Sequence, residues 1–326
     1  MSKKRDPVFD IARSLAIVLI VGFWHSFNYT TSGMPEWYYK FVRMIVQSSM
    51  GGLVLISGYF LGKQFIKNYN ELFAFYIRRI KRFWVLFCVA SLLLYASTTI
   101  MGYDWYKGIG NFVMSLFGLT CFIPPMPDTL WFMNMMMLFY ILTPAIKCVC
   151  KSHGVVISII LFLLLIIANH FNHADIRVLI YFPVYVIGLF LPEKIIEIAK
   201  GKETVLLCAS FLLLQFYYWA VDSSDWSVVS MIAGIIFLFS LSSLLAHNSV
   251  CVTIGNRVSY ASMCMYFFHR HIYSAFAILA SFLIGVPKLP AWFLIFFVLP
   301  VIYFISVVIQ RYYDNCVAKL EKLKVL

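Results

Sequence analysis

Long, nearly continuous runs of hydrophobic residues alternate with short polar stretches along the whole chain. The runs predict ten spans, at about 10–30, 41–62, 82–101, 129–147, 155–170, 177–192, 204–221, 227–246, 258–284 and 290–311. Each has about the length needed to cross a hydrocarbon core roughly 30 Å thick. Because the runs are continuous rather than alternating, they indicate α-helices instead of barrel strands. The apolar stretch 109–123 is shorter and is followed by two prolines, which predicts an interfacial or re-entrant segment.

Composition restricts the class of protein further. The chain has 326 residues, of which 62% are hydrophobic and only 12% are charged. A soluble domain of this size could not cover its surface with so few polar groups, so we predict a polytopic membrane protein. Lipid offers no hydrogen-bond partner to the backbone, which favours an all-α bundle. We expect one integral-membrane domain over residues 1–326.

The positive charges predict an orientation in the membrane. With the N-terminus placed inside, most of the 26 Lys and Arg residues fall in inside segments. Such a bias is typical of cytoplasmic loops, so both termini are expected in the cytoplasm. The net charge of +12 therefore reflects topology. We do not expect a nucleic-acid partner.

The first span carries two ionisable residues, Arg13 and His25. Ionisable groups within a span are costly and suggest a functional site. The structural alternative is that Arg13 reaches the interface and His25 is a hydrogen-bonded residue of the bundle. Twelve α-helical residues leave a net rotation of about 120° between them. A π-bulge, for which Gly22 is a plausible place, would bring them nearly into line.

A basic loop precedes the third span and contains Arg78, Arg79 and Arg82. The simplest interpretation is a topology signal. The functional interpretation is capture of an anion, because the forked guanidinium suits phosphates. With α-helical spacing, Arg78 and Arg82 would project from one face.

Polar residues also interrupt the second and fourth spans. Ser57 and Gly58 either permit close helix approach or offer a hydroxyl to a ligand. Trp131 stands where an interfacial aromatic is expected. Asn134 follows within the span, where a hydrogen bond between helices is the simplest role.

The ninth span holds His269, Arg270 and His271, the most polar cluster within any predicted span. An unpaired charge at this depth is expensive, so these side chains need partners, water or an anionic ligand.

Metal binding has little support. The spacing of His170, His173 and Asp175 could bind zinc, but a fourth ligand is missing. The eight cysteines form no CxxC pair and lie mostly in apolar runs, where they are expected to pack. We expect no metal site.

Five stretches, in this order, together resemble the membrane acyltransferase-3 family. They are Asp10 to His25, Ser57-Gly58-Tyr59, Phe75 to Arg82, Leu130 to Pro144, and Gly255 to His269. The family places ten residues between the arginine and the histidine of the first span, and this chain has eleven. The expected π-bulge would restore the register.

The resemblance implies an integral-membrane O-acyltransferase of a bacterial cell membrane. Such an enzyme moves an acyl group, most often acetyl from acetyl-CoA, to a hydroxyl of a cell-surface glycan or glycolipid. His25 would be the general base or form an acyl intermediate, and Arg13 would guide the donor. The phosphates of CoA would lie against Arg78, Arg79 and Arg82. The candidate substrate-binding residues are Ser57, Trp131, Tyr140 and His269, and His269 could instead orient His25.

Acetyl-CoA is expected as a co-substrate, without a permanently bound cofactor. The other expected partners are membrane lipid and, as a possibility, a second copy of the chain. Two alternatives remain open: a flippase or transporter for a glycan or lipid, and an inactive structural partner in an envelope-polymer machine.

Overall fold

The part of the chain that the computed structural model describes is mainly helical. That part comprises residues 6–30, 35–64, 66–100, 108–123, 126–127, 129–148, 153–194, 199–220, 228–286 and 288–323. Within these residues there is no β-strand, and an isolated bridge joins Thr30 and Leu289. The prediction of an all-α fold is confirmed.

The helices group into two compact units, with a boundary inside α2 (Glu36–Gly62). The terminal unit comprises Met1–Leu53 and Pro192–Leu326, and the central unit comprises Val54–Leu191. Besides part of α2, the terminal unit contains α1 (Pro7–Val18), the π-helix η1 (Leu19–Trp24), the 3-10 helix η2 (His25–Tyr29), α10 (Glu203–Ala220), α11 (Val228–Leu245), α12 (Ser249–Ile284), α13 (Ala291–Phe293), the π-helix η5 (Leu294–Val298) and α14 (Leu299–Leu323). The central unit contains α3 (Tyr69–Arg79), the π-helix η3 (Ile80–Trp84), α4 (Val85–Ile100), α5 (Gly108–Leu116), the 3-10 helix η4 (Leu119–Cys121), α6 (Trp131–Cys148), α7 (Gly154–His170) and α8 (Ile176–Phe190).

Each of the ten predicted spans contains a helix. Seven helical segments among the described residues are long and apolar enough to cross a membrane, and these are Pro7–Tyr29, Glu36–Gly62, Tyr69–Ser97, Glu203–Ala220, Val228–Leu245, Ser249–Ile284 and Ala291–Lys319. The other three predicted spans correspond to α6, α7 and α8. The stretch 109–123 forms the short helices α5 and η4.

Two segments that we expected to be loops are helical. The basic stretch before residue 82 forms α3, which continues through η3 into α4 as one candidate span, Tyr69–Ser97. Likewise, α12 begins at Ser249, nine residues before the predicted start at 258. Asn248 accepts hydrogen bonds from the N–H groups of Val250 and Cys251, so this side chain caps the helix and allows the earlier start.

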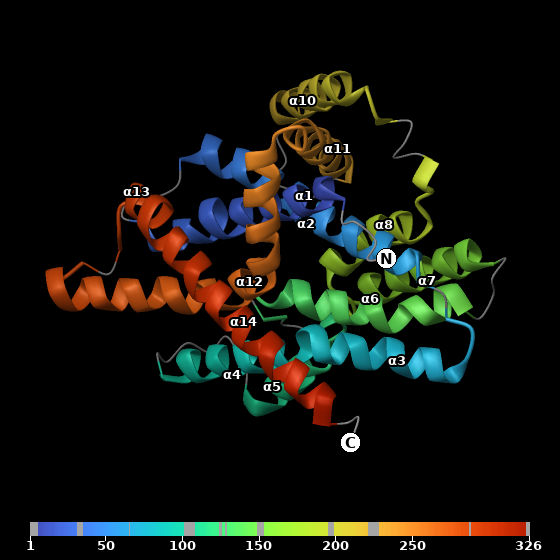
Figure 1. Ribbon diagram of the computed structural model, residues 1–326, viewed down its shortest axis with the longest axis horizontal. Helices are drawn as coiled ribbons and strands as arrows, with labels where there is room; N and C mark the ends of the chain where they lie inside the picture. Colours follow the sequence, from blue (N-terminus) through green and yellow to red (C-terminus); the bar gives the residue numbers. More distant parts are fainter. Residues whose placement is uncertain are drawn as a thin grey trace. The chain divides into compact units, whose positions relative to one another are not determined.

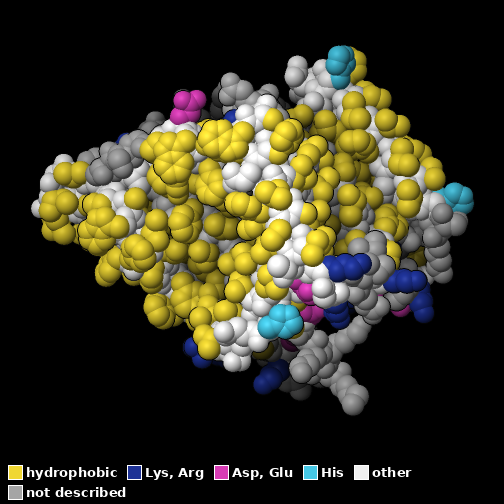
Figure 2. Space-filling view, turned by 90° about the horizontal axis from the view of Figure 1, so that it is seen from above, with side chains coloured by type: hydrophobic (Ala, Val, Ile, Leu, Met, Phe, Trp, Pro, Cys, Tyr) yellow, Lys and Arg dark blue, Asp and Glu magenta, His cyan; other side chains and the backbone are white. Residues whose placement is uncertain are grey.

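Hydrophobic side chains cover much of the face seen in Figure 2. On α14, Phe304 is 65% exposed and Val308 is 67% exposed. On the same helix, Ser306 and Gln310 are buried. Apolar residues outside and polar residues inside suit a helix that faces lipid, and this pattern supports a membrane protein.

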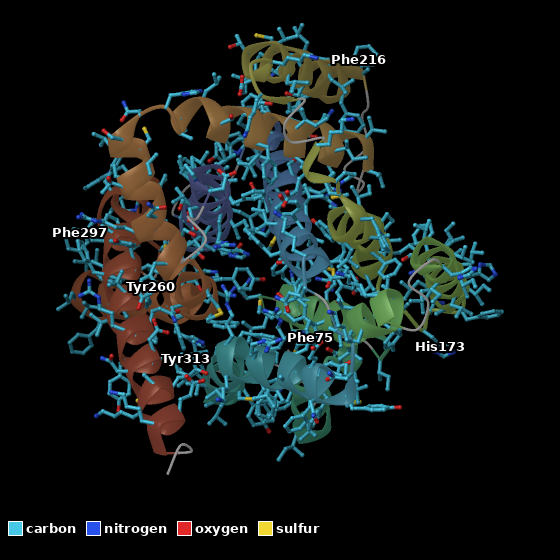
Figure 3. The ribbon with its side chains drawn as sticks, turned by 45° about the vertical axis from the view of Figure 1, so that its right-hand side comes forward. Phe75, His173, Phe216, Tyr260, Phe297 and Tyr313 are labelled. Carbon is cyan, nitrogen blue, oxygen red and sulfur yellow. The ribbon has the colours of Figure 1, made fainter. Side chains whose placement is uncertain are left out.

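In the terminal unit, α1 packs along α12. A Cβ atom added to Gly255 of α12 would lie only 2.7 Å from the Ile11 side chain, so the two backbones approach closely at this glycine. Beyond it, α12 changes direction partway along its length (Figure 1). The Tyr260 hydroxyl donates a 2.6 Å hydrogen bond to Asp314, which ties α12 to α14 beside the labelled Tyr313 (Figure 3).

In the central unit, the second part of α2 packs against α8. A Cβ atom on Gly58 of α2 would overlap the Tyr185 carbonyl oxygen of α8. A Cβ atom on Gly188 of α8 would in turn overlap the Leu55 carbonyl oxygen of α2. At the end of α2, the Lys147 ammonium donates to the carbonyls of Gly62 and Gln64. A cation there offsets the negative end of the helix dipole.

Candidate active site

The first helical segment contains the expected π turn between Arg13 and His25. The π-helix covers Leu19–Trp24, and the His25 N–H donates to the carbonyl of Ile20, five residues earlier. This extra residue reduces the rotation between the two side chains from about 120° to about 20°. Both side chains consequently contact α12, Arg13 at Ser259 and His25 at His269. The prediction of a π-bulge that includes Gly22 is confirmed.

The imidazole rings of His25 and His269 stack on one another. Their centroids are 4.5 Å apart and their planes differ by 5°. His25 is 5% exposed and His269 is fully buried. The Nδ1 atom of His25 has no hydrogen-bond partner among the described residues. A buried, unpartnered ring nitrogen is costly in a folded protein, so this atom suggests a ligand site.

The other nitrogens of the pair have different surroundings. The Nδ1 atom of His269 lies 3.0 Å from the Met265 carbonyl oxygen and 2.8 Å from that of Tyr266. Carbonyl oxygens can only accept hydrogen bonds, so the Nδ1 atom between them must be the donor and carries the proton. The Nε2 atom is then the acceptor in the neutral ring, and it has no partner within the described part of the chain.

Two tyrosines complete the surroundings of the histidines. The buried Tyr273 donates its hydroxyl to the carbonyl of Val21, within the π-helix. The Tyr29 ring stacks on that of Tyr273 with centroids 5.2 Å apart. The Tyr29 hydroxyl pairs with Ser274 at 3.1 Å. These contacts hold the end of the first helical segment against α12.

Arg13 belongs to a polar cluster between α1 and α12. Its Nη1 atom donates to the Ser259 hydroxyl at 3.1 Å and lies 3.5 Å from the Asp10 carboxylate. Ser259 in turn donates to Asp10 at 2.6 Å. Nearby, the Ser14 hydroxyl lies 2.6 Å from the Gly255 carbonyl oxygen. The Arg13 guanidinium therefore interacts with both a carboxylate and a hydroxyl, and these two contacts orient the guanidinium along α12.

Of the three arginines in the basic stretch, only Arg79 lies against aromatic side chains of the central unit. Its guanidinium carbon is 5.2 Å from the Phe75 ring centre and 5.6 Å from that of Tyr140. Phe75 is labelled in Figure 3. The Arg79 Nε atom is buried and has no partner among the described residues. A stacked guanidinium with an unpaired N–H is suited to an anionic ligand.

Arg78 and Arg82 are exposed on the surface of the chain. The interval between them is only partly α-helical, because α3 ends at Arg79 and the π-helix η3 begins at Ile80. The sequence therefore groups three arginines that the structure separates into one inward and two outward side chains.

The remaining candidates of the central unit lie in two places. Tyr140 contacts Arg79 and packs edge-on against Phe83, at 5.4 Å between ring centroids. Trp131 lies elsewhere, beneath the Arg177 guanidinium at 4.7 Å. Asp175 holds that guanidinium with bonds of 2.8 and 2.7 Å. Trp131 therefore has a structural partner of its own.

Ser57 is half-buried beside Gly58, whose contact with α8 confirms the interpretation of close helix approach. Asn134 also has the structural role that we expected. Its amide donates to the hydroxyls of Ser115 and Thr120, which joins α6 to α5 and η4.

The zinc hypothesis gains no support. Among the described residues, no group of three His, Cys, Asp or Glu side chains could hold a metal ion. Asp175 is paired with Arg177, while His170 and His173 are exposed. Burial and then the Asp175 carboxylate raise the pKa of the nearby Cys121 thiol to about 12, which disfavours the thiolate that would bind a metal.

Asp10, Ser259 and Tyr273 contribute to the site without having been predicted as site residues. Asp10 and Ser259 lie within the stretches that carry the family resemblance, and this position was the available signal. Tyr273 follows His269 by four residues, which places both on one helical face.

The long apolar helices and the hydrophobic exterior are those of a membrane protein. A family model described as an acyltransferase domain, that of acyltransferase-3, matches residues 6–311. The chain belongs to this family and is a membrane acyltransferase. Comparisons with curated proteins and with solved structures gave no match.

Proposed function

We propose that the protein transfers an acyl group, acetyl in the first instance, from a CoA thioester to a hydroxyl of a cell-surface glycan or glycolipid. The observation that carries the proposal is the buried, unpartnered Nδ1 atom of His25 in a chain of the acyltransferase family. Imidazole exchanges a proton near neutral pH, so it suits a general base.

In this proposal His25 acts on the acceptor hydroxyl. Its unprotonated nitrogen takes the hydroxyl proton while the oxygen attacks the thioester carbonyl. The tetrahedral intermediate then expels the CoA thiolate, which regains a proton from the His25 imidazolium. An alternative order acylates His25 first and then transfers the group to the acceptor. Arg13, fixed by Asp10 and Ser259, supplies positive charge near the start of the same helical segment.

We assign the phosphates of the donor to the arginines of the central unit. Arg79 offers an unpaired N–H beside two aromatic rings, and Arg78 and Arg82 offer exposed guanidiniums. Guanidinium forks bind phosphate oxygens in pairs, which suits the adenosine phosphates of CoA. Ser57, Trp131 and Tyr140 remain candidates for contact with the substrates.

The proposed setting is a bacterial cell membrane, with ten spans and both termini in the cytoplasm. The seven long apolar helices and the helical nature of the three remaining predicted spans support the count. The bias of Lys and Arg supports the orientation. The proposal treats residues 1–326 as one functional domain, and a homo-oligomer is compatible with it.

Binding of acetyl-CoA to the purified protein tests the proposal against a flippase. An acyltransferase predicts saturable binding that free CoA competes away, together with release of CoA thiol when an acceptor is supplied. A protein that binds a glycolipid but neither binds nor consumes acetyl-CoA would be a transporter. Octyl glucoside, a simple glycolipid with free hydroxyls, serves as the acceptor probe.

A further inference from the structure

The proposed base does not stand alone, because a second imidazole covers one face of its ring. His25 comes from the first helical segment and His269 from α12. Their planes are nearly parallel at 5°, with the centroids 4.5 Å apart. Face-to-face contact of this kind fixes the plane of the more exposed ring while leaving its edge free for a substrate.

His269 is itself held in one orientation. Its Nδ1–H lies between two carbonyl oxygens of its own helix, those of Met265 and Tyr266. A ring flip would place the Cδ2 carbon against these acceptors and lose both bonds. Tyr266 and Tyr273 pack on the ring at 6.0 and 6.4 Å between centroids. The ring is therefore a rigid support with a fixed tautomer.

Resting on the proposed function, we propose that His269 is a positioning residue for His25 and acts through the face of its ring. When His25 takes the hydroxyl proton, a cation forms in a buried place. The neutral face of His269 stabilises this cation by stacking, as aromatic faces stabilise other cations. Two imidazolium rings at this separation would repel strongly, so the pair holds one added proton at a time.

Three versions of the protein distinguish the contribution of the His269 ring face from that of its ring nitrogens. The wild type has both, His269→Phe keeps a flat ring without nitrogens, and His269→Leu removes the ring. The assay is CoA release from acetyl-CoA with octyl glucoside as the acceptor. We expect the kcat of the Phe variant to stay within about tenfold of wild type, and that of the Leu variant to fall about a hundredfold. The KM for octyl glucoside should change little in either variant.

Two kinetic results would overturn the proposal. A Phe variant as poor as the Leu variant would show that a nitrogen of His269 is required. A large rise in KM for octyl glucoside in the Phe variant would assign Nε2 to the substrate instead. Thermal unfolding of each variant in detergent identifies a loss of activity that comes from misfolding.

A second measurement does not depend on turnover. Nitrogen NMR of histidine-labelled protein in lipid nanodiscs reports which ring nitrogen carries the proton, and His269→Phe identifies the His269 signals. We expect His269 to keep its proton on Nδ1 throughout the neutral pH range. We also expect the His25 signals to move in the Leu variant and to stay close to wild type in the Phe variant. An unprotonated Nδ1 atom of His269, or equal shifts of the His25 signals in both variants, would refute the inference. Inactivity of the wild type towards acetyl-CoA would instead count against the proposed function.

Discussion

The backbone N–H of His25 donates its hydrogen bond to the carbonyl of Ile20, five residues earlier in the chain. This bond belongs to the π turn that brings the His25 ring onto the same neighbouring helix as Arg13. The register of the first helical segment is therefore a testable property of the site.

Deleting one residue from the π-helix, Phe23 for example, should convert this turn to regular α-helix and keep His25 close to its present direction. Transfer activity should then stay within about tenfold of wild type. Inserting one alanine after Val18 should instead rotate His25 by about 100° and abolish activity. Acetyl-CoA turnover by the two variants checks this prediction. An inactive deletion with a folded, active insertion would contradict the role of the π turn.

The arginines of the central unit should differ in their effects on donor binding. Arg79→Lys keeps the charge but loses the planar contact with Tyr140 and the fork, so affinity for acetyl-CoA should fall about tenfold or more. The double variant Arg78→Ala with Arg82→Ala should also weaken acetyl-CoA binding, through the loss of charge near the phosphates. Equilibrium binding of labelled acetyl-CoA measures both effects.

Acetyl-pantetheine, which lacks the adenosine phosphates, is the control ligand for these variants. Its binding should be unchanged by the double variant. Equal losses for both ligands would show that the arginines support the fold. Unchanged binding of acetyl-CoA would leave Arg78 and Arg82 as topology signals.

Asp10 and Ser259 should be energetically coupled. Ser259 donates to the buried Asp10 carboxylate and accepts from Arg13, so its removal leaves two charged groups with fewer partners. Ser259→Ala should cost about 1–3 kcal/mol of stability. A double-mutant cycle with Asp10→Ala should give a coupling energy of roughly 0.5–3 kcal/mol.

Thermal unfolding in detergent measures these differences. Thr253→Ala is the matched control, since the exposed Thr253 hydroxyl bonds only to its own helix, at Ser249. Its effect should be close to zero. Additive effects of the Asp10 and Ser259 substitutions would contradict the pairing.

Glycine substitutions should distinguish a tight helix contact from an open surface. A Cβ atom on Gly58 meets the backbone of Tyr185, Gly188 and Leu189, which cannot move aside as a side chain can. Gly58→Ala should therefore lower the unfolding temperature by several degrees, in line with an overpacking cost of about 1–3 kcal/mol. Gly110→Ala, on α5 with nothing within 4 Å, should be neutral or stabilising by up to about 1 kcal/mol. Similar effects at both positions would argue against the close approach of α2 and α8.

The hydrophobic runs and the spacing of residues along the helices predicted much of the architecture. Continuous apolar runs located a helix in each predicted span, since lipid leaves the backbone no other local solution. The π turn near Gly22 followed from the spacing of Arg13 and His25, because side-chain direction depends on residue count. Helix starts were less predictable where a cap decided them, as with Asn248 ahead of α12.

Side-chain direction within the site could not be predicted from one sequence. Nothing local distinguishes Arg79 from Arg78, yet Arg79 lies against Tyr140 and Arg78 is exposed. Neighbouring residues of α3 point about 100° apart, and tertiary packing decides which of the two faces inward. The bond between Asp10 and Ser259 joins distant parts of the chain, and a single sequence holds no record of such pairings. Asp10 and Ser259 come together because α1 packs on α12 in the folded chain.

The most direct test of the account is CoA release from acetyl-CoA by the purified protein and by its His25→Ala variant, with octyl glucoside as acceptor. The account predicts turnover by the wild type and a loss of about a hundredfold or more in the variant, with its unfolding temperature preserved. The variant should still bind acetyl-CoA, since the arginines are intact. Full turnover by a folded His25→Ala protein would contradict the central claim.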